Sequence, residues 1–480
     1  MAGIHQLLLV GVRALQAMGG RRRRALPAAL DGAAVDARLA GVAVFALVVG
    51  LAADDGGFRP LSWDRALVGI AVLAPFVRLR RPGRDGALFL CALAALAAWT
   101  AASWLWSASP ASALDEAQRV TLYAVVATAV VLCRPLGARA AVAGATVVVA
   151  CWNLAAGGNA PIGYANALAL LCALGLVLLP ALPRWAWLGV LPLGVVLVRQ
   201  HSLGAEAALL AGAIVLFVPR LRLVVVPLAI AALLVAPFAG SGHERGHYWR
   251  AAAREAEAHP VLGGGAGTFV NWWVRERDVP QQTEEAHSLY VETLAELGPL
   301  GLALVLTVFA IPLATARRPE LAAGVAVYAV GVTVDFDWEL AAVTVPAIVV
   351  AALAVTDLRP RPLRARVVIP AAAALAVAGL LAYAGNSRLS AAQDAAVRGD
   401  FAAAQSDARA ALRWQPYSPQ PWLVIGDVTH DADAYRRAVA LDPADWLLWQ
   451  RLASVESGRL RRLAEAKAAQ LNPLGGASGS

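Results

Sequence analysis

Two stretches of this 480-residue chain carry the residue types that catalysis uses most often. The first, "GSGHERGHYWRAAA" at 240–253, contains the pattern HExxH. In zinc proteases this spacing places two histidines on one helix face and uses the glutamate as general base. The second is His287, which precedes "SLYVETLAELGPLG". A histidine titrates near neutral pH and therefore suits general-base catalysis.

The HExxH pattern is a poor zinc helix when its neighbours are considered. Gly242 precedes it, and Gly246 lies inside it at a cost of about 1 kcal/mol relative to alanine. Arg245 would place a cation beside the metal. Only Glu255 or Glu276 could serve as a third ligand. We therefore predict a site without a metal, and a membrane zinc protease remains an alternative.

Arginines give the same segment a second interpretation. Arg245, Arg250 and Arg254 follow one another along it, and Arg199 lies at the end of an apolar segment. The planar guanidinium matches the oxygens of a phosphate, so we predict that these four arginines bind a diphosphate. The alternative is a set of salt bridges to the neighbouring glutamates, Glu244, Glu255 and Glu257.

Two further patterns suggest ligands but have simpler explanations. The stretch "LGGGAGTF" at 262–269 fits neither phosphate-binding glycine motif, so a tight turn that allows close backbone packing is the preferred interpretation. The pairs Asp54/Asp55 and Asp335/Asp337 have the carboxylates that a divalent ion prefers. A catalytic metal there is the less favoured reading of a common pattern.

The composition shows what must position these residues. The chain is 59% hydrophobic and 15% charged, with a mean hydropathy of +0.61, which is typical of a polytopic membrane protein. We predict an all-α membrane bundle of about 12–13 transmembrane helices. The expected spans are 38–53, 64–79, 86–104, 118–133, 139–156, 164–182, 185–199, 203–218, 222–239, 295–315, 320–335, 338–356 and 367–384.

Arginine distribution predicts the orientation of the bundle. Connections rich in arginine alternate with acidic or neutral ones, and basic loops stay on the cytoplasmic side. The basic ones are 78–84, 133–139, 219–222, 316–320 and 359–366. We therefore expect a multi-pass protein of the plasma (cytoplasmic) membrane with a cytoplasmic N-terminus and an extracytoplasmic C-terminus. The net charge of +8 reflects arginines near lipid headgroups, and we expect no nucleic-acid partner.

This topology divides the chain into three parts. Residues 1–37 form a cytoplasmic or interfacial segment, and residues 38–384 form the transmembrane domain. That domain includes a large, helical outer loop at 240–294. Residues 385–480 form an extracytoplasmic tail.

The tail contains alanine-rich helices that end near a proline, with a tryptophan opening the next helix. The segments "ALRWQPYSPQPWLVIG", "AVALDPADWLLWQRLA" and "AAQLNPL" resemble shortened tetratricopeptide repeats. Such repeats form binding surfaces, so a protein partner is one expectation. A helical cap without a partner is the other.

The segment that begins at His287 is similar to a signature of the O-antigen ligase and polymerase family. It reads as His and Ser, followed by Glu296, Gly298 and Gly301. "HERGHYWR", "HPVLGGGAGTF", "WSASPASAL", "PIGYANALA" and "VDFDWELAAVTVP" also resemble segments of that family. The resemblance extends over about residues 40–355.

The resemblance implies a metal-independent, inverting glycosyltransferase with no cofactor. Its donor would be a glycan linked to a polyprenyl diphosphate in the bilayer, and its acceptor a hydroxyl of a glycan, lipid or protein. Arg245 and His287 would be catalytic, and Arg250, Arg199 and Arg254 would assist Arg245 at the diphosphate. The motif residues Gly298, Gly301 and Glu296 would be structural.

One departure from the family keeps a second hypothesis open. Where the family has Ser-Arg-Gly, this chain has Ser202, Leu203 and Gly204. Arg199, about one helical turn earlier, could replace the arginine. Otherwise the core is a degenerate scaffold whose tail binds envelope-assembly proteins. Ligation and polymerisation use the same donor, so both products remain open.

Overall fold

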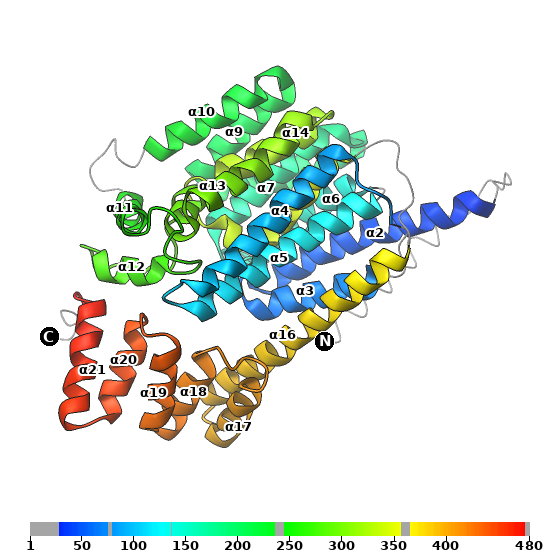
Figure 1. The fold of residues 1–480 in the computed structure, drawn as a ribbon. Coiled ribbons are helices and arrows are strands. Elements are labelled where there is room, and N and C mark those ends of the chain that lie inside the picture. Colours follow the sequence, from blue (N-terminus) through cyan, green and yellow to red (C-terminus); the bar gives the residue numbers. More distant parts are fainter. Residues whose placement is uncertain (1–27, 75–78, 136, 236–243, 357–364, 476–480) are drawn as a thin grey trace.

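The computed structural model describes residues 28–74, 79–135, 137–235, 244–356 and 365–475. Its regular secondary structure in these ranges is helical throughout (Figure 1), so the expected all-α class is confirmed. The predicted interfacial segment up to residue 27 lies outside the described residues, as does His243 of the HExxH pattern.

The bundle is built from twelve main helices and several short 3-10 turns in the described ranges. The helices are α2 (Ala28–Ala53), α3 (Pro60–Leu73), α4 (Arg84–Ala102), α5 (Pro110–Cys133), α6 (Ala138–Ala156), α7 (Ala165–Leu178), α8 (Val190–Gln200), α9 (Leu203–Phe217), α10 (Arg222–Val235), α13 (Leu289–Thr315), α14 (Pro319–Gly331) and α15 (Ala341–Ala354). The 3-10 turns are η1 (Asp55–Gly57), η3 (Ser103–Leu105), η4 (Leu179–Ala181), η5 (Arg184–Gly189), η6 (Pro219–Leu221) and η8 (Asp337–Glu339).

Four of the described helices are long and apolar enough to cross a membrane, fewer than the 12–13 predicted. They are Arg84–Leu105, Pro110–Cys133, Ala138–Ala156 and Leu289–Thr315. A fifth span results if α9 and α10, which are bent by 119° at a short break, count as one. Other predicted spans form shorter apolar helices, such as Pro319–Gly331 and Ala341–Ala354. These fall below the roughly 17–25 residues that a span needs.

Local sequence signals set where several of these helices begin. Prolines occupy the first turn of α3, α5 and α14, where a missing N–H costs nothing. At the start of α13, the side chain of Ser288 accepts a hydrogen bond from the N–H of Val291 at 3.4 Å. The chain therefore enters α13 directly after His287.

The centre of the bundle is formed by α7, α14 and α15, most of whose residues are buried. Small residues allow these helices to approach closely. A Cβ added at Gly324 of α14 would lie 2.8 Å from Val350 Cγ1 of α15. Close packing over small residues is the usual way in which apolar helices associate.

The arginine-rich connections gather at one end of the bundle. Arg222 donates to the carbonyl oxygen of Ala316 at 2.6 Å, which joins the connections before α10 and after α13. Arg139 forms an ion pair with Glu320, which joins the starts of α6 and α14.

The acidic and neutral connections meet at the other end. A Cβ added at Gly56 would lie 2.7 Å from Leu340 Cδ2 and 2.9 Å from the carbonyl oxygen of Ile162. Three connections far apart in sequence are therefore in contact there. The alternation of basic and acidic connections corresponds to the two ends of the bundle.

The described part of the segment 240–294 contains α11 (Glu244–Ala258), α12 (Phe269–Glu276) and the start of α13, at the acidic end. The tail comprises α16 (Ala365–Val397), α17 (Phe401–Ala411), α18 (Gln420–Thr429), α19 (Ala432–Leu441), α20 (Trp446–Val455) and α21 (Gly458–Leu471). Figure 1 shows it as a row of helices along the lower edge of the molecule, with α20 and α21 beneath α11 and α12. The predicted boundary at residue 385 falls inside α16, which runs unbroken from the bundle into the tail.

Candidate functional site

Asp335, in the connection between α14 and η8, is a shared anchor for segments that are far apart in sequence. Tyr164 donates its hydroxyl to Oδ1 of Asp335 at 2.6 Å, and Arg245 donates from Nη2 to Oδ2 at 3.1 Å. Asn166 also donates to Oδ2. Asp335 is 4% exposed, so these donors compensate the burial of its charge. It therefore links α7, α11 and the start of η8.

His287 lies in the last turn of the connection that leads into α13. Its φ of 55° is in the left-handed region, which few residues other than glycine adopt. The ring Nδ1 lies 3.0 Å from the backbone carbonyl oxygen of Glu285. A carbonyl only accepts, so Nδ1 carries the proton and Nε2 is left unprotonated in the neutral ring. The tautomer therefore presents Nε2 as a base.

Burial keeps His287 neutral. Loss of solvent lowers the pKa of its imidazole below the usual value. The negative charge of Asp335 acts in the opposite direction, whereas the positive charge of Arg245 lowers the pKa further. The ring also packs 5.1 Å from that of Tyr248 and 5.0 Å from that of Phe336, measured between centroids. His287 is therefore a neutral base at pH 7. We call Arg245, Asp335 and His287 the inner group.

The residue before His287 is held from two sides. Trp249 of α11 donates from Nε1 to the carbonyl oxygen of Ala286 at 3.0 Å. The N–H of Ala286 donates to Oε2 of Glu292 at 2.6 Å. Directly after His287, the N–H of Leu289 donates to the carbonyl oxygen of Val332 at 3.0 Å. The strained position of His287 is thus fixed by α11, α13 and α14.

The other predicted arginines do not join the inner group. Arg250 is exposed and contacts His247 Nδ1 at 2.9 Å. Arg254 pairs with Glu276 at 2.9 Å. Arg199 is exposed in the last turn of α8 and makes no ion pair with another described residue. Arg254 thus forms a salt bridge, but with Glu276 and not with the three glutamates that the sequence suggested. Of the four arginines, only Arg245 pairs with Asp335.

The HExxH segment provides a second set of polar side chains at its surface. Nδ1 of His247 lies 2.6 Å from Oδ1 of Asp278 in the connection after α12. This contact lowers the pKa of Asp278. We call Arg250, His247 and Asp278 the outer group. Glu244, the glutamate of the pattern, accepts from Nε2 of Gln281 at 2.9 Å. The described part of the pattern is thus bound to other protein side chains.

The glycine-rich stretch packs against the backbone of α13, as the tight-turn interpretation predicts. The N–H of Gly265 donates to the carbonyl oxygen of Glu296 at 2.8 Å. Gly298 has a φ of 66°, and a Cβ there would lie 2.6 Å from the carbonyl oxygen of Val261. The carboxylate of Glu296 accepts from the N–H of Phe269 at 3.0 Å. Gly298 and Glu296 are therefore structural residues of this crossing, and Gly301 is buried in the same helix.

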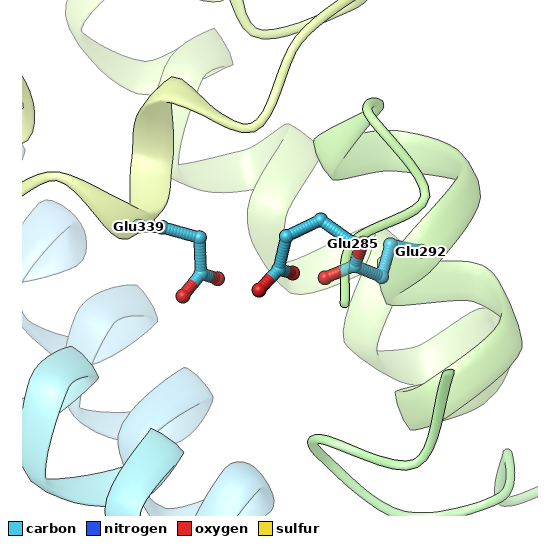
Figure 2. Close-up of side chains that lie close together, drawn as sticks. All are labelled: Glu285, Glu292 and Glu339. Carbon is cyan, nitrogen blue, oxygen red and sulfur yellow. The ribbon is translucent and has the colours of Figure 1, made fainter. Parts of the chain in front are cut away.

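Sequence reasoning missed an acidic group beside the inner group. Figure 2 shows the side chains of Glu285, Glu292 and Glu339 turned toward one another, with carboxylate oxygens within 4.8 Å. Arg119 of α5 forms ion pairs with Glu339 and with Glu116. Burial raises the pKa of Glu285 to about 7. Arg119, which is 2% exposed, supplies the positive charge for this group. No periodicity in the sequence indicates that these residues meet.

One aspartate of each pair is likewise bound by other protein side chains. Asp54 accepts from Ser62 at 2.8 Å and from Arg65 at 3.0 Å. Both oxygens of Asp335 accept hydrogen bonds from protein donors. Asp337 is 2% exposed, and burial raises its pKa.

No family model matches the chain, and no curated protein matches it significantly.

Proposed function

We propose that this protein transfers a glycan from a polyprenyl diphosphate to an acceptor hydroxyl at the acidic end of its bundle. The observation that carries the proposal is the inner group, in which a neutral, partly buried His287 lies in the field of Arg245 while Asp335 holds that arginine. A base beside a fixed cation is the pair that a glycosyl transfer with an anionic leaving group requires.

Each of the two side chains has one task in this reaction. Nε2 of His287 takes the proton of the acceptor hydroxyl as its oxygen attacks the anomeric carbon. The bond between that carbon and the diphosphate oxygen breaks, and the electron pair leaves with the diphosphate. Arg245 neutralises the charge that develops on this leaving group. Attack opposite the leaving group inverts the anomeric carbon.

The diphosphate site proposed here is narrower than the four arginines suggested by sequence. Arg245 is 36% exposed at its side chain, so part of its guanidinium can reach a ligand while Asp335 holds Nη2. Arg250 and Arg254 contact other protein groups. We therefore propose Arg245 as the principal ligand. Arg199, in the last turn of α8, remains a proposed second ligand. Gly204, at the start of the next helix α9, packs on Val334, the neighbour of Asp335, and this brings that part of the chain toward the inner group.

The setting of the inner group supports a donor that resides in a bilayer. α13, which begins two residues after His287, is long and apolar enough to cross a membrane. A group at its first turn would meet the headgroup of a lipid-linked substrate. We propose that this end is extracytoplasmic, as the arginines at the opposite end indicate. The acceptor is a hydroxyl of a glycan, lipid or protein.

The test is turnover by the full-length protein in lipid nanodiscs. A defined oligosaccharide on polyprenyl diphosphate is supplied with an acceptor glycan, with and without a metal chelator. We expect the lengthened acceptor and free polyprenyl diphosphate in equal amounts, with no effect of the chelator. Hydrolysis of a peptide with loss of activity on chelation would favour the zinc protease instead. Repeated lengthening of the product would identify a polymerase.

A further inference from the structure

The C-terminal tail is attached to the rest of the molecule at three points along its length. At its root, Asn386 of α16 donates to Oδ2 of Asp64 at 2.6 Å, and Gln415 donates to Oδ1 of Asn386 at 2.6 Å. In its middle, Ser109 at the start of α5 donates to Oδ1 of Asp442 at 2.9 Å. The third point lies after the last helix, α21.

At this third point, a buried arginine of the outer segment binds the end of the tail. Arg277, which caps α12, donates from Nη2 to Oδ1 of Asn472 at 2.9 Å. Both residues are buried, at 7% and 2% exposed. Nη1 of Arg277 donates to the carbonyl oxygen of Gln281 at 2.8 Å. Both terminal nitrogens of the guanidinium thus donate to uncharged oxygens, and burial lowers its pKa.

The middle contact also reaches α12. Asn271 of α12 donates to Oγ of Ser109 at 2.8 Å, and Ser109 in turn donates to Asp442. Trp446, the first residue of α20, packs against the aromatic cluster that contains Trp249 and Trp273. The tail therefore contacts α12 near both of its ends.

A continuous set of packed rings leads from α12 to His287. Trp273 of α12 meets Tyr248 of α11 edge to face, with centroids 4.8 Å apart. Tyr248 in turn packs 5.1 Å from His287. Nε1 of Trp273 donates to the same carbonyl oxygen of Gln281 that Arg277 binds, at 3.2 Å. A shift of Arg277 therefore acts on the ring that supports Tyr248.

We propose that the tail is an intramolecular clamp, and that Asn472 and Trp446 are positioning residues that hold α12 and thereby the ring of His287. The docking of the tail is independent of the reaction, whereas the effect on catalysis rests on the proposed function. A buried donor that loses its acceptor is costly, so release of Asn472 leaves the Arg277 guanidinium to draw water into the contact.

Hydrogen–deuterium exchange of the full-length protein in nanodiscs tests the docking. We expect Asn472→Ala to speed exchange in the α12 peptide about tenfold, with exchange in α4 and α5 unchanged. Asn472→Asp keeps an oxygen for Arg277 and adds a charge that complements it, so this variant should retain slow exchange. Gln470→Ala removes an exposed amide from the last turn of α21, two residues before Asn472, and is the matched control.

Two results would overturn the clamp. One is wild-type exchange of α12 in Asn472→Ala, and the other is equal acceleration by Gln470→Ala. If Asn472→Ala does not fold, Trp446→Ala answers the same question, because it removes packing from the other end of the contact. Its expected acceleration also lies in α12, and wild-type exchange there would likewise refute the proposal.

The catalytic part has a separate readout. A looser α12 admits water to His287, so its pKa returns toward the usual value and the acid limb of the pH–rate profile moves to higher pH. We expect this shift in Asn472→Ala and its absence in Asn472→Asp. Faster exchange without any shift would leave the clamp standing and refute its role in positioning. Faster exchange in a protein that transfers no glycan would refute the proposed function alone.

Discussion

The inner and outer groups are made of the same three residue types, yet they lie on different faces of α11. Arg245 and Arg250 are five positions apart, which is about 140° around a helix. Arg245 therefore turns toward buried Asp335, whereas Arg250 turns to His247 and to water. Burial lowers the pKa of His287, while the outer contact lowers the pKa of exposed Asp278. The difference in burial therefore makes His287 a candidate base, whereas His247 remains in a surface contact with Asp278.

Replacing each of the two histidines by alanine should give the largest difference between the inner and outer groups. His287→Ala removes the proposed base and should lower kcat for transfer about 10²- to 10⁴-fold. His247→Ala removes a surface contact and should change it less than about fivefold. Radiolabelled glycan transfer in nanodiscs, at matched protein levels, measures both. Full activity of His287→Ala would mean that another group takes the proton.

The arginine pair should give the next largest difference. Arg245→Ala leaves the leaving-group charge uncompensated and should lower kcat/KM about 10²- to 10³-fold. Arg250→Ala should stay within about fivefold of wild type, because its contacts are exposed. Steady-state kinetics with varied donor separates the two. Equal losses in both variants would mean that Arg250, on the exposed face of α11, also binds the diphosphate.

Replacing the aspartate of each group, Asp335 in the inner and Asp278 in the outer, tests whether Arg245 must be held in place. Asp335→Asn keeps the shape but removes the charge that fixes Arg245, so we expect a loss of about 10- to 100-fold. Asp278→Asn, which weakens only the contact to His247, should have little effect. The same kinetic assay applies. If Asp335→Asn were as active as wild type, the anchor would be dispensable.

The smallest effect is expected in the pH profile. Because burial lowers the pKa of His287, transfer should persist as the pH falls through about 6.5 and decline only below it. Asp335 raises this pKa, so Asp335→Asn should move the acid limb further down. Measuring kcat/KM across pH 5–8 locates the acid limb in wild type and in Asp335→Asn. A limb above pH 6.5 in wild type would contradict a buried base.

Sequence reasoning predicts the helical class and the two ends of the bundle because both depend on composition. Arginines mark connections such as 133–139 and 316–320, whose helices pair through Arg139 and Glu320. Four or five of the described helices could span a membrane, and the larger number of 12–13 stays a prediction. Hydropathy does not distinguish a membrane span from a helix buried by its neighbours, and α14 and α15 are apolar because they lie in the centre.

The candidate site was predicted in part. His287 and Arg245 stood out as residue types next to apolar helices, and the structure brings Arg245 to Asp335 and His287 to Phe336, the next residue. The link of Arg245 to Tyr164 through Asp335, and the neighbouring pair of Arg119 with Glu339, depend on contacts between helices distant in sequence. Spacing along one helix cannot reveal such contacts. The helical period alone could have shown that Arg245 lies on a different face of α11 from Arg250 and Arg254.

The crossing of the glycine-rich stretch over α13 has a consequence for protein engineering. Gly263 and Gly298 both have positive φ, at 76° and 66°, and a side chain on either would meet the backbone of the other segment. A mutational library should therefore find almost no tolerated change at these two positions, whatever reaction is selected. Variation to alter the proposed acceptor belongs on the exposed face of α11, where a new side chain meets solvent and side chains of the segment that follows.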